Sequence, residues 1–308
     1  MTTQTWLWII FNVSTVTLMF LDIKISSRKQ EPMSVKEALL WSAGWIALAL
    51  VFNAVIYSLR GMESALTFLT CYLVEESLSV DNMFVFLMIF TYFKVPARNQ
   101  YKVLFYGILG AVVMRLIFIF TGVTLVERFH WLIYLFGAFL IFTGIKMIFS
   151  KDKETQPDKN PVVTLFRRYF PVTDEYEGGK FFLSKNGKKM ATPLFIVVLV
   201  VMTSDLMFAV DSIPAVLAIT QDFFLVYTSN VLAIMGLRAL FFVLAGMMNL
   251  FHYLQHGLSL ILMFIGAKMM LDHFYPMPIF VALGVVTGIL VISIMASLVR
   301  MKVKKTKA

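Results

Sequence analysis

Two apolar stretches of this chain carry carboxylates at the same spacing. The residues concerned are Glu75, Asp81 and Asn82 in the first stretch and Asp205, Asp211 and Ser212 in the second. In each stretch an acid is followed six positions later by an aspartate, and a small amide or hydroxyl comes next. An ionised carboxylate at the centre of a bilayer costs at least about 2.5–3.5 kcal/mol, and folding does not require that cost twice. The repeated pattern therefore indicates a functional polar site.

The side chains of this pattern offer oxygen ligands. No His or Cys stands at a matching position, and carboxylate, carbonyl and water ligands suit Mn²⁺, Mg²⁺ or Ca²⁺ better than Zn²⁺ or Cu⁺. Up to four carboxylates that face one another cannot all stay ionised in an empty, dry site, so some of them hold protons when the metal is absent. The six residues are therefore candidate ligands of a divalent metal whose movement is coupled to protons.

Four further charged residues accompany the pattern. Arg115 and Arg238 lie inside apolar runs and are candidate gating residues or built-in counter-charges. The alternative for both is a structural role, in which they cap helix carbonyls or pair with acids. Glu76 directly follows Glu75, and a helix would point it elsewhere. Asp22 ends an apolar run, where it is either interfacial or part of the cavity, so Glu76 and Asp22 are candidate accessory residues.

The elements that must position these residues are membrane-spanning helices. The chain is 59% apolar with a mean hydropathy of +0.82, and its apolar runs are continuous, unlike the alternating strands of a β-barrel. About 20 apolar residues suffice for one span. The expected spans are 5–23, 36–58, 62–91, 102–126, 129–149, 192–220, 224–250, 255–273 and 277–299. The fold class is therefore an all-α polytopic membrane protein with nine transmembrane helices.

The basic residues predict the orientation of these spans. Of the 27 Lys and Arg residues, 21 lie on one side of the expected membrane, two on the other and four within spans. Because loops rich in Lys and Arg stay in the cytoplasm, the N-terminus is expected outside the cell and the tail Arg300–Lys307 in the cytoplasm. The membrane is expected to be the inner or plasma membrane of the cell. This clustering explains the net charge of +9 without nucleic acid as a partner. The lone Cys71 permits no disulfide within one chain.

Spans 3–5 resemble spans 6–8. Glu75 aligns with Asp205, Asp81 with Asp211, and Arg115 with Arg238. The block Phe142–Met147 aligns with Phe264–Met269, which matches Gly144 with Gly266 and Lys146 with Lys268. An odd number of spans per unit inverts the second copy, and inverted repeats with polar residues at matching depth are typical of secondary transporters. The expected domains are 1–60 (two helices), 61–149 (first repeat), 150–191 (cytoplasmic linker), 192–273 (second repeat) and 274–308 (last helix and basic tail).

A regular helix poses a problem for each pair of acids. Six residues leave the two carboxylates of a pair about 120° apart around the axis, so one face cannot present both. Either protein surrounds the helix on most sides, or the helix is unwound between the acids. Pro214 favours unwinding in the second stretch, because it cannot donate to the carbonyl of Val210.

The two stretches resemble the signature motifs of the TerC family. The motifs are Glu75-Glu-Ser-Leu-Ser-Val-Asp81-Asn82-Met-Phe-Val-Phe86 and Asp205-Leu-Met-Phe-Ala-Val-Asp211-Ser-Ile-Pro214-Ala215, and the likeness extends through the whole chain, closest to the nine-span branch. The resemblance implies Mn²⁺ efflux and puts Glu75, Asp81, Asp205 and Asp211 at the metal path. Met202 stands where many relatives have Glu, which removes one carboxylate from the family's pattern.

Several functional alternatives stay open. Oxygen ligands fit an exchanger of Ca²⁺ or another divalent cation as well as a Mn²⁺ exporter. A non-transporting membrane factor in assembly or stress responses is a different class, and it would tolerate loss of the midplane acids. An enzyme is not expected, because no nucleophile–base pair or nucleotide loop is present. The expected partners are a divalent metal ion as substrate, protons and the lipid bilayer, with no tightly bound cofactor.

Overall fold

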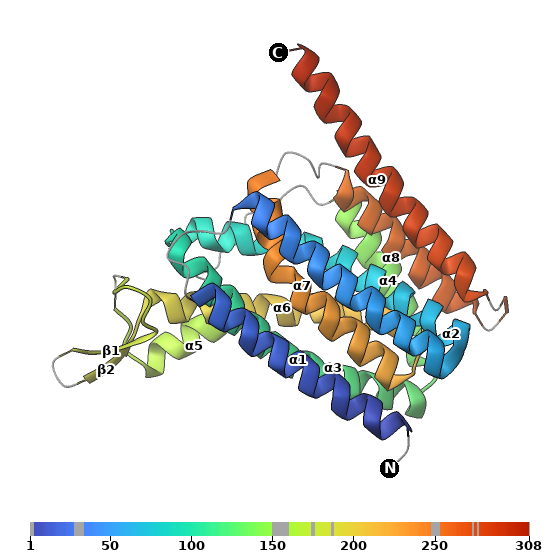
Figure 1. The fold of residues 1–308 in the computed structure, drawn as a ribbon, viewed down its shortest axis with the longest axis horizontal. Coiled ribbons are helices and arrows are strands. Elements are labelled where there is room, and N and C mark those ends of the chain that lie inside the picture. Colours follow the sequence, from blue (N-terminus) through green and yellow to red (C-terminus); the bar gives the residue numbers. More distant parts are fainter. Residues whose placement is uncertain are drawn as a thin grey trace. The chain divides into compact units, whose positions relative to one another are not determined.

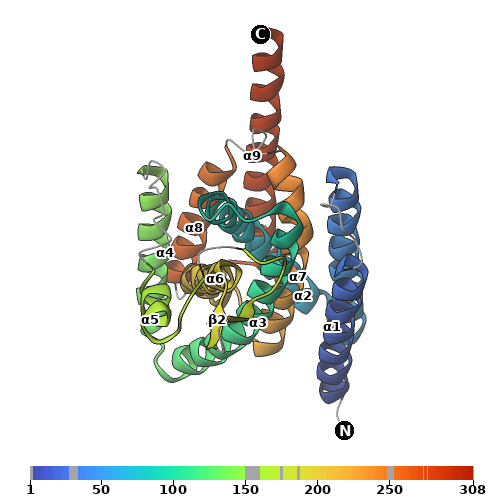
Figure 2. The same ribbon diagram turned by 90° about the vertical axis from the view of Figure 1, so that its left-hand side faces the viewer.

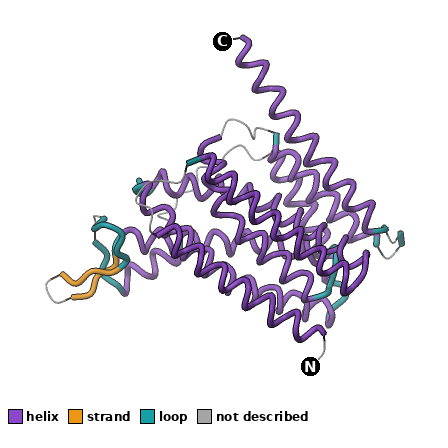
Figure 3. The backbone as a smooth tube through the Cα atoms, in the orientation of Figure 1, coloured by secondary structure: helices purple, strands orange, loops and turns teal. Residues whose placement is uncertain are grey.

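The computed structural model describes residues 3–27, 34–149, 160–173, 176–185, 188–247, 253–272, 274–275 and 277–307. Helices dominate this part of the chain, and the only strands in it form one small hairpin (Figure 3). The helices are α1 (Thr3–Ser27), α2 (Val35–Tyr92), α3 (Ala97–Arg128), α4 (Leu132–Phe149), α5 (Pro161–Tyr169), α6 (Pro193–Leu217), α7 (Phe223–Met247), α8 (Leu254–Leu271) and α9 (Ile279–Lys307), labelled in Figure 1.

The described helices fit a polytopic membrane protein. Six of them, namely α2, α3, α4, α6, α7 and α9, contain stretches long and apolar enough to cross a membrane, and shorter apolar stretches lie at Thr5–Leu21 and His256–Leu271. Each of the nine expected spans overlaps one of these helices, and the number of nine stays a prediction because six helices meet the length and hydropathy needed for a span. The all-helical membrane class is therefore confirmed for the described chain.

Helix α2 contains a break that separates two of the expected spans. Gly61 has φ 84° and ψ 179° inside this 58-residue element. A residue with a Cβ rarely adopts that backbone conformation, whereas glycine does so at little cost. A Cβ there would meet no atom within 4 Å, so the backbone angle, not crowding, is what favours glycine. The break lies between the expected spans 36–58 and 62–91.

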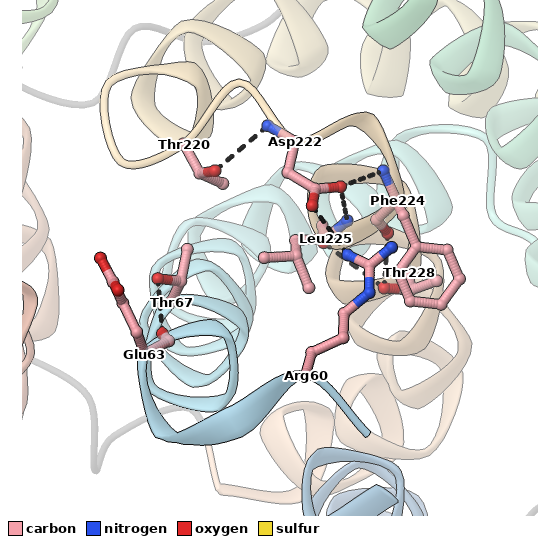
Figure 4. Close-up of polar contacts among 8 residues, drawn as sticks. All are labelled: Arg60, Glu63, Thr67, Thr220, Asp222, Phe224, Leu225 and Thr228. Atoms are coloured by element: carbon pink, nitrogen blue, oxygen red, sulfur yellow. Dashed lines mark hydrogen bonds and ion pairs between the residues drawn. The ribbon is translucent and has the colours of Figure 1, made fainter. Parts of the chain in front are cut away.

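Side chains around this break connect it to the start of α7 (Figure 4). Arg60 Nη1 donates to Asp222 Oδ2 at 2.7 Å, and the guanidinium lies over the ring of Phe224, 4.7 Å from its centroid. The other oxygen of Asp222 accepts from the backbone N–H groups of Phe224 and Leu225 at 2.9 and 3.3 Å. Asp222 is thus both the N-cap of α7 and the ion-pair partner of Arg60, which directly precedes the break in α2.

Asp222→Ala is expected to lower the free energy of unfolding by about 1–2 kcal/mol. It removes an N-cap, worth about 1 kcal/mol, and a partly exposed ion pair, worth roughly 0.2–1 kcal/mol. The measurement is the thermal unfolding midpoint of the detergent-purified protein. Asp272→Ala is the control, because Asp272 is 52% exposed and its ion pair with Lys268 lies along one helix. Equal midpoints for the two variants would contradict the capping role.

The chain divides into two compact units that each combine distant segments. Unit 1 comprises Met1–Ser34, Phe84–Val113 and Thr155–Leu206, and unit 2 comprises Val35–Met83, Met114–Glu154 and Met207–Ala308. Helices α2, α3 and α6 each contribute to both units.

In unit 2, helix α8 packs against α4 and against α9 (Figure 2). The α4–α8 crossing brings backbone against backbone. A Cβ built on Gly266 would lie 2.6 Å from the carbonyl oxygen of Gly137, and one on Gly144 would lie 2.8 Å from that of Ser259. Gly137 thus meets Gly266 and Gly144 meets Ser259, so the helices run antiparallel. Small residues allow this approach in membrane helices.

The segment 150–191 was expected as a linker, and its described residues from Asn160 onward, which belong to unit 1, contain a helix and a hairpin. Asn160 caps α5 by accepting from the N–H of Val162 at 2.9 Å and donates to Thr203 of α6 at 2.7 Å. Phe166 of α5 packs on Phe195 of α6 with ring centroids 5.2 Å apart. Strands β1 (Phe182–Lys185) and β2 (Lys188–Ala191) pair antiparallel, with Phe182 opposite Ala191. Helix α5 and this hairpin were not predicted from the sequence.

Tyr176, in the same segment, is expected to lose its phenol proton at a higher pH than an exposed tyrosine. Its hydroxyl donates to the carbonyl of Phe93 at 2.7 Å, and burial raises the pKa of its phenol from 10 to about 12. Since the raised pKa favours the neutral form in the folded state, the associated stability is complete below pH 10 and is lost as the pH rises through 12. Absorbance titration at 295 nm of the wild type minus Tyr176→Phe should show a midpoint near pH 12; a midpoint near 10 would contradict the burial.

Candidate functional site

A buried polar junction joins three helices of unit 2. Glu75 of α2, Arg115 of α3 and Ser212 of α6 are only 0%, 1% and 1% exposed. Arg115 Nη1 donates to the Glu75 carboxylate and to Ser212 Oγ, the latter at 3.2 Å. Glu75 and Ser212 belong to the two different acidic stretches of the sequence. The structure therefore brings one residue of each stretch to the same guanidinium.

The charge balance of the junction explains why it can be buried. A single buried carboxylate or guanidinium costs several kcal/mol, and the attraction between partners at contact distance offsets much of that cost. Removing either partner leaves the other charge without compensation, which is strongly destabilising. Glu75 and Arg115 therefore each offset part of the cost of burying the other.

An apolar layer lies next to the junction on the same three helices. Cys71, Ile119 and Ala209 are buried at 0% and belong to one hydrophobic cluster with Val123 and Val216. Cys71 precedes Glu75 by one turn, Ile119 follows Arg115 by one turn, and Val216 follows Ser212 by one turn. The cluster thus fills the space toward the Gly61 break and the C-terminal ends of α3 and α6.

Asp211 faces a different neighbour from Ser212, the next residue. It is half-buried and hydrogen-bonded to the Thr143 side chain, with Lys146 close enough to interact electrostatically. Both partners come from α4. One residue corresponds to about 100° around a helix, which accounts for the divergence. Sequence reasoning missed Thr143, although it lies inside the Phe142–Met147 block that also recurs in the second repeat.

Helix α6 is continuous between Asp205 and Asp211, so the expected unwinding at Pro214 is wrong. The element runs without a break from Pro193 to Leu217. Pro214 removes one donor to the Val210 carbonyl, but proline is tolerated in membrane helices where neighbours and local adjustment compensate the freed group. The two acids of this helix therefore point in directions about 120° apart.

Glu76 points toward α7 and the first part of α2. A Cβ on Gly236 of α7 would lie 3.7 Å from Glu76 Oε1 and 3.6 Å from Trp45 Cβ. Tyr72 is hydrogen-bonded to Glu76, and Glu76 Oε2 has no hydrogen-bond partner among the described residues. Glu75 and Glu76 thus have separate surroundings, as their helical positions predict.

The remaining predicted site residues are placed as follows. Asn82 of α2 is 5% exposed and Arg238 of α7 is 4% exposed, both in unit 2. Asp205 is 3% exposed and belongs to unit 1. The side chains of Asp81 and Asp22 lie outside the described residues. Within the described residues, no three His, Cys, Asp or Glu side chains converge on one point.

Met202 is a packing residue of unit 1. A Cβ on Gly110 of α3 would lie 2.1 Å from Met202 Cε, and one on Gly107 would lie 2.6 Å from a methyl of Val201. The methionine side chain therefore fills the groove that Gly110 leaves open. The resemblance to the family implied a carboxylate at this position in many relatives, and here a methionine packs against α3.

Comparisons with known proteins agree with the motifs. The model of the integral membrane protein TerC family matches residues 60–305. An uncharacterized membrane protein of Myxococcus xanthus is 48% identical over 294 residues, which cover 96% of this chain and 92% of that protein. Alx of Escherichia coli strain K12, provisionally named a membrane-bound redox modulator, is 47% identical over 296 residues, covering 93% and 92%.

A further relative extends these matches. An uncharacterized membrane protein of Rickettsia bellii is 40% identical over 293 residues, which cover 95% of this chain and 97% of that protein. No solved structure matches. The predicted family is confirmed by these matches, and its members are generally transporters or membrane factors. This chain, with its similarity to Alx, belongs to the TerC family of integral membrane proteins.

Proposed function

We propose that this protein is a secondary transporter that exports Mn²⁺ from the cytoplasm through carboxylates near the membrane midplane, coupled to proton movement. The candidate ligands are those predicted from the sequence, namely Glu75, Asp81, Asn82, Asp205, Asp211 and Ser212. The metal is the substrate, and oxygen ligands of this kind suit Mn²⁺. Exchange of Ca²⁺ is the alternative with the same ligand chemistry.

The observation that carries the proposal is the buried junction of Glu75, Arg115 and Ser212. Ionisable groups inside membrane segments are costly to bury, and they commonly line ion and proton pathways. Here the ionisable pair comes from α2 and α3, its neutral partner Ser212 comes from α6, and all three are at most 1% exposed. A site assembled from several helices can change its ligand geometry when the helices move, as a transporter requires.

The α4–α8 crossing supports the inverted repeat on which the proposal rests. The matched blocks align Gly144 with Gly266, and extending this alignment without a gap to seven residues before these glycines pairs Gly137 with Ser259. The contact of Gly137 with Gly266 then corresponds to the contact of Ser259 with Gly144. A twofold relation between two inverted three-helix units produces such exchanged contacts. Nine spans, an outside N-terminus and a cytoplasmic tail in the cell membrane complete the proposed topology.

The name of Alx suggests a redox role. In this chain the single cysteine argues that such a role would be indirect and would not use a thiol. Cys71 is the only cysteine, and it is buried at 0% within the apolar cluster beside the junction. Thiol exchange requires an accessible thiolate. Transport of a redox-active metal ion would link this protein to redox balance without using its thiol.

The decisive experiment is Mn²⁺ accumulation in inside-out membrane vesicles, with wild type compared with Asp211→Asn at equal protein level. Loss of the carboxylate is expected to reduce the initial rate at least tenfold, because an amide oxygen is a weaker ligand than a carboxylate. Asp272→Asn is the matched control at an exposed helix end and should keep the wild-type rate. The concentration of Ca²⁺ that halves the rate of Mn²⁺ uptake then shows which of the two ions the protein prefers.

Two results would count against the exporter. If Asp211→Asn transports like the wild type, the predicted site is not the transport site. If the wild type accumulates no more Mn²⁺ than empty vesicles, with and without a pH gradient, the non-transporting assembly or stress factor becomes the better account.

A further inference from the structure

We propose that Arg115 is a tethered cation that occupies the metal's place at Glu75 in the ion-free protein and must leave it before a divalent ion binds there. This inference rests on the proposed function, because it concerns the same site. It assigns to Arg115 a positioning role that the sequence left open between structure and gating.

The first step is the position of the guanidinium. One nitrogen, Nη1, contacts both Glu75 of α2 and Ser212 of α6, which are candidate metal ligands from the two different repeats. A metal ion that bridged the two repeats through these oxygens would lie at the same point. The guanidinium and the metal therefore exclude each other by volume as well as by charge.

The second step is charge. Glu75 supplies one negative charge at a position with 0% exposure. Arg115 carries the same sign of charge as a metal ion, so while it contacts Glu75 it repels a divalent cation at that carboxylate in a poorly screened interior. Withdrawal of the guanidinium returns the carboxylate to the incoming ion. The ion pair between Arg115 and Glu75 thus stabilises the ion-free state and lowers the affinity of the site for metal.

The third step concerns what closes the junction. The hydrophobic cluster of Cys71, Ile119 and Val216 lies one turn away on the same three helices, toward the end of the molecule that the proposed topology puts outside. The structure therefore describes a state in which the tethered cation sits beneath a closed apolar layer. Release of the metal outward would require this layer to open, and the return of Arg115 to Glu75 would then promote dissociation.

The test is Mn²⁺ binding to the purified protein, measured from the electron paramagnetic resonance signal of free Mn²⁺. Arg115→Gln removes the competing charge and is expected to lower the dissociation constant at least tenfold, which is about 1.4 kcal/mol. A residue that only supports the structure would leave the affinity unchanged or weakened. Arg128→Gln is the matched control, because it removes the same charge from the exposed C-terminal end of the same helix.

A second comparison covers the case in which Arg115→Gln does not fold. The double variant E75Q/R115Q has no buried charge without a partner at this pair. It is expected to bind Mn²⁺ at least tenfold more tightly than E75Q, in which the guanidinium still repels the ion. The proposal is overturned if neither arginine substitution tightens binding relative to its parent. If the wild type neither binds nor transports Mn²⁺ or Ca²⁺, the proposed function fails and this inference fails with it.

Discussion

Glu75→Gln is expected to abolish Mn²⁺ accumulation and to lower the free energy of unfolding by about 3–5 kcal/mol. The amide keeps the shape of the side chain but not its charge, so Arg115, which is 1% exposed, loses the carboxylate that it contacts. Breaking a buried ion pair by removing one partner has a cost of this size. The measurements are vesicle uptake and the denaturation midpoint of the purified protein in detergent.

The variant E75Q/R115Q separates the two effects of this substitution. Because it removes both charges, it should recover most of the lost stability while transport stays absent. Glu63→Gln is a control for the amide substitution itself, since Glu63 is exposed on the same helix and should leave both measurements unchanged. If E75Q unfolds at the wild-type midpoint, Glu75 is not the counter-charge on which the burial of Arg115 depends.

The helical framework could be predicted from the sequence because the length of an apolar run directly limits what it can form in a membrane. The break at Gly61 is an example. Two apolar runs flank Arg60 and Gly61, and the structure has one long element interrupted there by a backbone conformation that favours glycine. Gly144 and Gly266 also recur in the matched blocks of the sequence, but their role in close helix contact became visible only in the structure.

The partners of the site residues could not be predicted in the same way. Glu75 and Arg115 are 40 residues apart, and whether they meet depends on how α2 and α3 are rotated about their axes, which similar apolar faces do not specify. The same holds for Asp211 and Thr143. The prediction of an unwound helix at Pro214 was wrong because the sequence shows that proline lacks a backbone N–H donor. It does not show the neighbouring helices that keep α6 intact. Helix α5 and the β1–β2 hairpin were missed because short polar elements have weak local signals.

Gly266→Ala is expected to destabilise the protein by about 3 kcal/mol or more, although alanine is the better helix former. The added Cβ would lie 2.6 Å from the carbonyl oxygen of Gly137 and 2.9 Å from a side-chain carbon of Ile141. A backbone atom cannot turn away as a side chain can, so α4 and α8 must separate. Overpacking costs about 1–3 kcal/mol and sometimes more, and here it also removes the close contact of two helices.

Gly284→Ala provides the matched control for this substitution. Gly284 lies in α9, is exposed, and a Cβ there meets no atom within 4 Å, so alanine should be neutral or stabilise by up to about 1 kcal/mol. Gly144→Ala should resemble Gly266→Ala, because its Cβ would meet the carbonyl of Ser259 at 2.8 Å. Denaturation midpoints of the three variants test this order. Equal midpoints for Gly266→Ala and Gly284→Ala would mean that α4 and α8 do not pack through these glycines, and the twofold relation inferred from their contacts would lose its support.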